Sequence, residues 1–249
     1  MLRHIINIVA RMANNIRILA VPLAAAAILN ACGQPPPPAN TGVKREAGYP
    51  TRWFEPVNDP KKPDWEILPQ EAGPGEVILS KRNELGILSN FAATPFAYHE
   101  RKYASLEGFW QMMLYPEGKD DARSKFTGIG WKFTREQVSQ MTAFDAKAAG
   151  TLAEENMKRM GIDWCTFEGK RFPYRTAVPG EHYRLIVEAT RAKVDQNPEV
   201  KRLLLATDKL ILKPDHHGEP DPPPEWKYYE ILTQIRTELQ KTDQQKPPR

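Results

Sequence analysis

Proline sets the first limit on what this chain can fold into. Residues 32–75 contain the run Pro35–Pro38 and then prolines at positions 50, 56, 60, 63, 69 and 74. Because proline fixes φ and has no backbone N–H, such a stretch favours extended, polyproline-II-like chain. We therefore expect a linker over residues 32–75, one domain of ordinary size over residues 76–241 and a disordered tail over residues 242–249.

Three aromatic residues are unusual in such a linker. Trp53, Phe54 and Trp65 carry large apolar surfaces that a free chain would leave in water. Two alternatives stay open for them: an extended arm packed on the domain, or free chain.

The 31 residues at the N-terminus have the layout of an export signal. Arg3, Arg11 and Arg17 precede an apolar run over residues 18–29. A basic region, a short apolar region and small residues at a cleavage point describe a signal peptide. The run is twelve residues long, well below the ~20 that a membrane-spanning helix needs. We expect residues 1–31 to be a signal that is removed.

The end of this segment resembles the lipoprotein signals of bacteria. It reads Leu29-Asn30-Ala31-Cys32, with Asn30 an unusual second residue for such a box. The resemblance implies that Cys32 becomes the first residue and carries diacylglycerol and palmitate. The lipid would then anchor the protein to a membrane of the bacterial cell envelope, which is the outer membrane in a Gram-negative cell. An ordinary secretory signal or an uncleaved anchor is the alternative.

Charge and cysteine content exclude several classes of function. The chain has 35 basic and 31 acidic residues; three of the basic residues lie in the signal, leaving 32 against 31, a net charge of +1. No basic field remains that would indicate a nucleic-acid partner. Besides Cys32 the chain has only Cys165, so an internal disulfide is excluded and the fold depends on its core. We expect no metal and no cofactor.

The hydrophobic pattern predicts an α+β domain, rich in helices and with a small antiparallel sheet. Extended segments are expected at 76–80, 87–91 and 210–212, with a hairpin over 96–103 that turns near His99 and Glu100. Helices are expected at 105–115, 145–160, 181–196, 198–206 and 226–241.

Two charged residues lie on apolar helix faces. In the first helix, Leu106, Phe109, Trp110 and Met113 form the buried stripe, and Glu107 borders it. The helix N-terminus favours the ionised form of Glu107 whereas burial favours the protonated form, which is how an acid or base is often tuned. A plain first-turn partner of the helix dipole is the simpler interpretation. On the helix over 181–196, Lys193 shares a face with apolar residues and either extends to the edge or points into a polar pocket.

Several runs resemble, in the same order, the NADAR superfamily over about residues 78–240. They are 86–91 (GILSNF), 95–96 (PF), 103–111 (YASLEGFWQ), 169–175 (GKRFPYR), 181–186 (EHYRLI), 191–197 (RAKVDQN) and 203–207 (LLLAT). The resemblance implies a helix-rich α+β fold and a metal-independent N-glycosidase. Substrates in that superfamily are ribose-linked and usually phosphorylated, such as ADP-ribose on guanine or ribosylamino intermediates of riboflavin synthesis.

The resemblance also implies roles for single residues. Glu107 matches the glutamate of the Ser-x-Glu motif and is the expected key carboxylate, because cleavage of a ribosyl C–N bond passes through an oxocarbenium-like state. Ser89, Asn90, Phe91 and Gln111 would line the substrate pocket, and Lys193 would bind a phosphate or carboxylate.

The later part of the chain departs from the superfamily pattern. Trp164 matches a second catalytic position only if a loop is allowed for, and Asp215 matches the late acidic position only after a shift of two residues. The Trp-Gly that ends the segment in the superfamily is absent. An alternative is therefore a membrane-tethered module that binds a nucleotide, an ADP-ribose-like ligand or a protein partner without catalysis.

Overall fold

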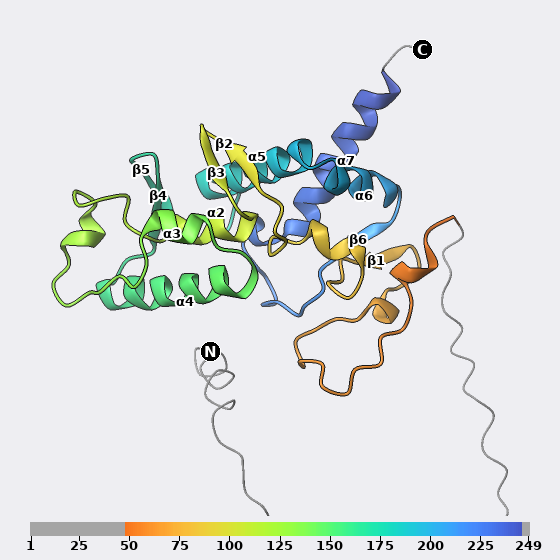
Figure 1. Cartoon of the computed structure of the whole chain (residues 1–249), viewed down its shortest axis with the longest axis horizontal. Coiled ribbons are helices and arrows are strands. Elements are labelled where there is room, and N and C mark those ends of the chain that lie inside the picture. Colours follow the sequence, from red (N-terminus) through yellow and green to blue (C-terminus); the bar gives the residue numbers. More distant parts are fainter. Residues whose placement is uncertain (1–47, 246–249) are drawn as a thin grey trace, which may run out of the picture. The chain divides into compact units, whose positions relative to one another are not determined.

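A computed structural model describes residues 48–245 of the chain (Figure 1). The predicted signal over residues 1–31 and the predicted lipid attachment at Cys32 lie outside these residues. The described part contains six α-helices and three two-stranded sheets, so the predicted α+β class is confirmed. No helix among the described residues combines the length and the apolar character that crossing a bilayer requires.

The helices lie close to where the sequence predicts them. They are α2 (Leu106–Met112), α3 (Arg135–Ser139), α4 (Ala143–Met160), α5 (Glu181–Gln196), α6 (Pro198–Ala206) and α7 (Tyr228–Gln244). Helices α5 and α6 match their predicted bounds, whereas α3 was not predicted. Helix α7 continues through residues that were assigned to the C-terminal tail.

Local capping explains several of these bounds. The Ser105 hydroxyl accepts a hydrogen bond from the Gly108 N–H (2.9 Å) at the start of α2 and donates one to the Met141 carbonyl (2.8 Å). Gly161 ends α4 in the left-handed region, with φ 67°. Pro198 occupies the first turn of α6, where its missing N–H costs nothing.

Three strand pairs make up the sheets. Strand β1 (Glu76–Ile78) pairs in parallel with β6 (Ile211–Lys213). The antiparallel pairs are β2 (Phe96–Tyr98) with β3 (Arg101–Tyr103), and β4 (Trp164–Phe167) with β5 (Lys170–Pro173). The first hairpin is the predicted one; the β4–β5 hairpin was not predicted. The β1–β6 pair is parallel, since a long crossover that holds most of the helices joins the two strands.

The turn of the predicted hairpin has an unusual backbone. His99 and Glu100 both have positive φ, 47° and 61°, as the favoured two-residue hairpin turns require. Glycine and asparagine normally occupy such positions, and their absence is why the turn could not be typed from sequence. Glu168 (φ 50°) and Gly169 (φ 75°) form the corresponding turn between β4 and β5.

One predicted extended segment is wrong. Residues Glu84–Leu88 form the 3-10 helix η3 instead of leading into a strand at 87–91. Asn83 caps this turn, because its side chain accepts the Leu85 N–H at 3.0 Å. Leu85 and Leu88 are both buried because residues three apart lie on one side of a 3-10 helix, whereas a strand buries alternate residues.

Part of the predicted linker belongs to the packed domain. Trp53 and Phe54 are 1% and 5% exposed and join the hydrophobic core, whereas Trp65 is exposed. The indole N–H of Trp53 donates to Glu84 at 2.6 Å. Short 3-10 turns, η1 (Thr51–Trp53) and η2 (Pro69–Glu71), fold this proline-rich chain onto the domain. The prolines of this segment restrict the path of the chain, yet Trp53 and Phe54 are buried.

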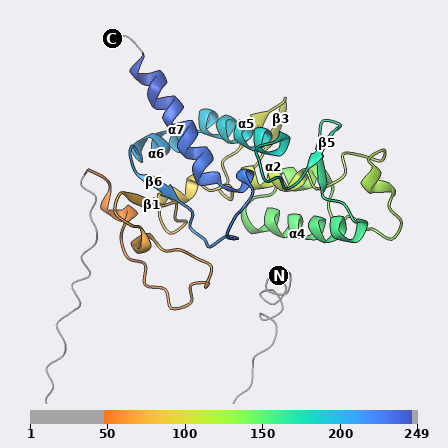
Figure 2. The same ribbon diagram turned by 180° about the vertical axis from the view of Figure 1, so that it is seen from behind.

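Helix α2 is the centre of the core. It packs against α3, α4 and α5, and both views show it between α4 and α5 (Figures 1 and 2). All seven of its residues, including Glu107 and Gln111, are buried. The remaining short helices are η4 (Ala122–Lys125) and η5 (Pro224–Trp226). The fold therefore buries a carboxylate and an amide in its most enclosed helix.

Candidate functional site

Glu107 lies in the first turn of α2 and is held from two sides. Its Oε1 accepts a hydrogen bond from Nε2 of Gln111, one turn later, at 2.8 Å. Its backbone N–H donates to the carbonyl of Asn90 at 2.9 Å. This second bond joins the start of α2 to the loop of Ser89, Asn90 and Phe91, whose role as the lining of a substrate pocket stays a prediction.

Burial decides the protonation of Glu107. The residue is only 6% exposed, and this burial raises the pKa of its carboxyl against the opposing effects of the Gln111 hydrogen bond and the Lys147 charge. The helix N-terminus, which favours the ionised form, does not outweigh burial here. The Glu107 carboxyl therefore keeps its proton to a higher pH than an exposed glutamate does.

Gln111 is placed by a glycine on the neighbouring helix. Its Oε1 is buried without a hydrogen-bond partner in the described structure. A Cβ at Gly150 of α4 would lie 1.8 Å from this oxygen. Only glycine at position 150 therefore allows α4 to approach α2 closely enough to hold Gln111 against Glu107.

Asp215 lies in the loop after β6 and is almost fully buried. Its Oδ2 is ion-paired with Nζ of Lys81, and its Oδ1 is bonded to Nδ1 of His216 at 3.0 Å and to the Tyr228 hydroxyl at 3.4 Å. Burial would raise the pKa of Asp215, but the His216 bond and the Lys81 charge outweigh it and lower the pKa. Lys81 and Asp215 meet because they follow β1 and β6, two parallel strands that end at the same edge.

The Asp215 loop and Glu107 both have neighbours in the loop of residues 89–91. The Glu107 N–H donates to the carbonyl of Asn90. Lys81, the ion-pair partner of Asp215, lies 5.3 Å from the centre of the Phe91 ring. The 89–91 loop therefore lies next to Glu107 and next to the Lys81 partner of Asp215.

Sequence reasoning missed Tyr174 and Glu154, which are linked to Trp110 of α2. The Tyr174 hydroxyl donates to Glu154 at 3.0 Å and accepts the Trp110 indole N–H at 3.3 Å. Burial raises the pKa of Tyr174, and the charges of Glu154 and Glu107 add to the effect. Tyr174 is part of the run at 169–175 that resembles the superfamily, which was a signal for it. No sequence signal pointed to Glu154, because it looks like any other polar residue on an amphipathic helix.

The contacts of two further predicted site residues, Trp164 and Lys193, are with protein groups. Trp164 is the first residue of β4. The guanidinium groups of Arg171 and Arg123 lie 3.9 Å and 5.0 Å from the centre of its ring. Lys193 is fully buried, and its Nζ donates to the backbone carbonyls of Ser89 (2.7 Å) and Leu88 (3.4 Å). Lys193 neither extends to the surface nor points at a free pocket: it holds the end of η3.

Within residues 48–245, no group of three or more His, Cys, Asp or Glu side chains is placed to hold a metal ion. The accessible charges of the site belong instead to Lys81 and His216, whose side chains are 33% and 47% exposed.

Comparisons with known proteins give one partial likeness. No protein-family model matches the sequence, and no curated protein matches it. The structure is similar to the NMR structure of the E. coli protein YbiA, with 20% sequence identity over 68% of this chain and 86% of that chain, at a TM-score of 0.43. Likeness at this level carries no conclusion about activity.

Proposed function

We propose that this protein is an N-glycosidase that hydrolyses a ribosyl C–N bond in a nucleotide-like or ADP-ribosylated substrate. The observation that carries the proposal is the pair of buried carboxyl groups, Glu107 and Asp215, whose pKa values are shifted in opposite directions. Two carboxyl groups whose surroundings move their pKa values apart are a usual arrangement for acid–base work on glycosidic bonds. The motif resemblance at Glu107 supports the same assignment.

The chemistry assigns Glu107 the proton transfers. As the C–N bond breaks, its electron pair moves to nitrogen, and the protonated Glu107 supplies the proton that makes the base a neutral leaving group. Water then adds to the ribosyl carbon and gives up a proton, which the Glu107 carboxylate can accept. Asp215 has a lowered pKa, so its negative charge would favour the cationic transition state, whereas the positions that it fixes for Lys81 and His216 serve the substrate phosphate.

The same site contains cations suited to a phosphorylated substrate. Lys81 and His216 are held by Asp215 but keep much of their surface exposed. The Lys81 ammonium, beside the 89–91 loop, and the His216 imidazole are a better phosphate-binding pair than Lys193, which donates to backbone carbonyls. We therefore assign substrate phosphate to Lys81 and His216.

Incubation of the purified chain with ADP-ribosylated guanine nucleotide and with ribosylamino-pyrimidine phosphate tests the proposal. Chromatography should show release of the free base, and Glu107→Gln should lower the rate by about 100-fold or more. Glu155→Gln, which changes an exposed carboxylate of α4, is the matched control and should keep the parent rate. No turnover by the parent, or a Glu107→Gln variant as active as the parent, rejects the activity.

A non-catalytic ligand-binding module is the second candidate. The observation that favours it concerns Trp164, a predicted catalytic residue whose ring is stacked with the guanidinium groups of Arg171 and Arg123. In that case calorimetry would show tight binding of ADP-ribose and chromatography would show no product. Glu107→Gln would then change the affinity for ADP-ribose, and neither the parent nor the variant would have a measurable rate.

A further inference from the structure

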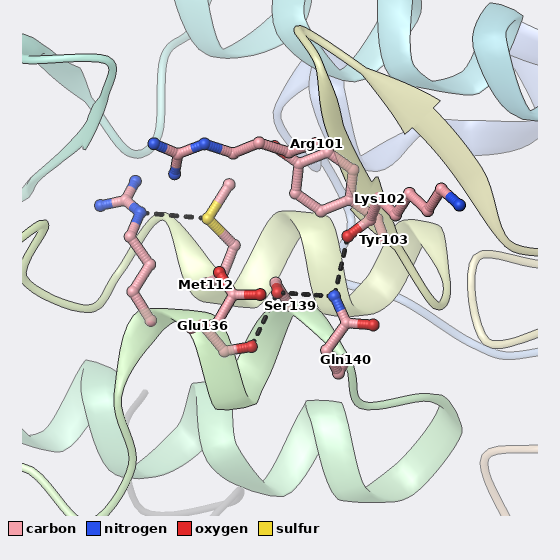
Figure 3. A pocket seen from close by; sticks show the side chains of 8 residues that line it. Arg101, Lys102, Tyr103, Met112, Glu136, Ser139 and Gln140 are labelled. Carbon is pink, nitrogen blue, oxygen red and sulfur yellow. Dashed lines mark hydrogen bonds between the residues drawn. The ribbon is translucent and has the colours of Figure 1, made fainter.

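A cavity lies away from the residues assigned above. It has a volume of about 380 Å³ and lies between β3, the end of α2 and α3. Figure 3 shows the Arg101 and Lys102 side chains of β3 extending in opposite directions, with Gln140 bonded to the Lys102 carbonyl. None of Glu107, Asp215, Lys81 or His216 lines this cavity. Its volume is in the range of small-molecule sites, about 300–1,000 Å³.

The lining is cationic and its charges are poorly compensated. Arg101 and Lys102 are exposed and have no ion-pair partner among residues 48–245. Arg135 is 9% exposed, and its nearest carboxylate, Glu117, is 3.6 Å away, too far for a hydrogen bond. With the single carboxylate of Glu136, three cations leave the lining at a net charge of +2.

The guanidinium of Arg135 is hydrogen-bonded mainly to uncharged groups. Its donors go to neutral acceptors: the Met112 sulfur (3.1 Å), the Tyr115 carbonyl (2.9 Å) and Thr166. Burial lowers the pKa of Arg135 to about 10. The one carboxylate paired with Arg135 is Glu117 at 3.6 Å, and a buried cation whose hydrogen bonds go to neutral groups is stabilised further when an anion reaches it.

Tyr103 provides an independent sign of a missing ligand. The residue is 2% exposed and its hydroxyl has no hydrogen-bond partner in the described structure. Tyr103 lines the cavity together with Arg101 and Arg135. A buried hydroxyl that donates to nothing is costly and uncommon.

We propose that this cavity binds a phosphate-bearing small anion, separately from the Glu107 region. Arg101 and Lys102 would meet the anion at the mouth, Arg135 would supply charge from within, and the Tyr103 hydroxyl would donate a hydrogen bond to a phosphate oxygen. Phosphate fits these groups better than a carboxylate does, since it has charge of about −1.5 to −2 and three acceptor oxygens.

Calorimetry on the purified full chain tests the site with pyrophosphate, inorganic phosphate, ADP and adenosine. Pyrophosphate and ADP should bind, whereas uncharged adenosine should not. The double variant Arg101→Gln/Lys102→Gln should weaken pyrophosphate binding at least tenfold. Lys201→Gln/Arg202→Gln removes the same charge from α6 and should leave binding unchanged. Glu107→Gln should also leave it unchanged, which separates this site from the proposed active site.

Tyr103→Phe distinguishes a ligand-binding hydroxyl from a structural one. The variant should melt at the same temperature as the parent or higher when no anion is present, because it loses a polar group without a partner, yet bind pyrophosphate several-fold more weakly. Absence of pyrophosphate binding by the parent would overturn the proposal. So would an equal loss in the α6 control, which would indicate unspecific charge attraction, or a loss in Glu107→Gln, which would place the anion at the other site.

Discussion

At the scale of single residues, Gly150 and Gln111 show how one missing side chain shapes the candidate site. Gln111 is positioned by α4 as well as by its own helix, and it in turn holds Oε1 of Glu107. The polar character of this pair is visible in sequence, since both residues border an apolar stripe one turn apart. The requirement for glycine at position 150 is not, because it comes from a helix that starts more than thirty residues later.

The substitution Gly150→Ala tests this dependence. The new Cβ would overlap Oε1 of Gln111 and force the amide away from Glu107, and overpacking of a core costs about 1–3 kcal/mol. Thermal unfolding should show the loss, and the proposed activity should fall with it. Gly118→Ala is the matched control, since a Cβ there meets nothing within 4 Å. If the double variant Gly150→Ala/Gln111→Ala is no more stable than Gly150→Ala, the clash is not with Gln111.

At the scale of elements, Lys193 ties α5 to the turn that precedes the Ser89 loop. A buried lysine usually pairs with a carboxylate, whereas here the amine donates to two carbonyls at the end of η3. Because the next residues of that chain accept the backbone N–H of Glu107, α5 helps to place the start of α2. Lys193 thus acts on the candidate site through the backbone and not through a ligand.

The burial of Lys193 predicts a specific pH dependence. Burial lowers its pKa from 10.5 to about 7, so between these values the unfolded chain binds more protons than the folded one. The free energy of unfolding should therefore rise as the pH increases through this window. Urea unfolding at pH 7 and pH 9.5 measures it, with Lys193→Met as the reference that lacks the group. An equal rise in parent and variant would show that Lys193 is not the cause.

At the scale of the whole molecule, the predicted lipid anchor and the proposed chemistry together define what the protein would act on. The NADAR resemblance points to substrates that are largely intracellular, whereas an envelope anchor would place the domain outside the cytoplasm. If both proposals hold, the substrate is a ribosyl compound of the envelope or the extracellular space.

Labelling with an alkyne analogue of palmitate tests the anchor at Cys32. The parent chain expressed in bacteria should incorporate the label and sediment with membranes, because the thiol of Cys32 is the proposed attachment point. Cys32→Ser should lose both properties. Cys165→Ser is the control: the Cys165 thiol is buried and free, and burial raises its pKa to about 12, so it should not react. Label on Cys32→Ser would contradict the assignment.

Sequence patterns were informative wherever a structure depends on near neighbours. Helices α5 and α6 were predicted at their observed bounds, because apolar periodicity and Pro198 define them locally. The β4–β5 hairpin was missed, since its turn relies on Glu168 in a left-handed conformation that no residue type announces. The segment after Asn83 was misassigned, because a side-chain cap outweighed its extended preference.

The sequence by itself determined the α+β class, most helices and Glu107 as the residue to examine, because periodicity and motifs are read along the chain. Only the tertiary structure decided that the pKa of Glu107 is raised while that of Asp215 is lowered, that Lys193 donates to backbone carbonyls, and that Trp53 belongs to the core. Each of these depends on burial and on charges contributed by distant segments. The field and the solvent around a side chain are set by what folds against it, and that information is absent from its neighbours in sequence.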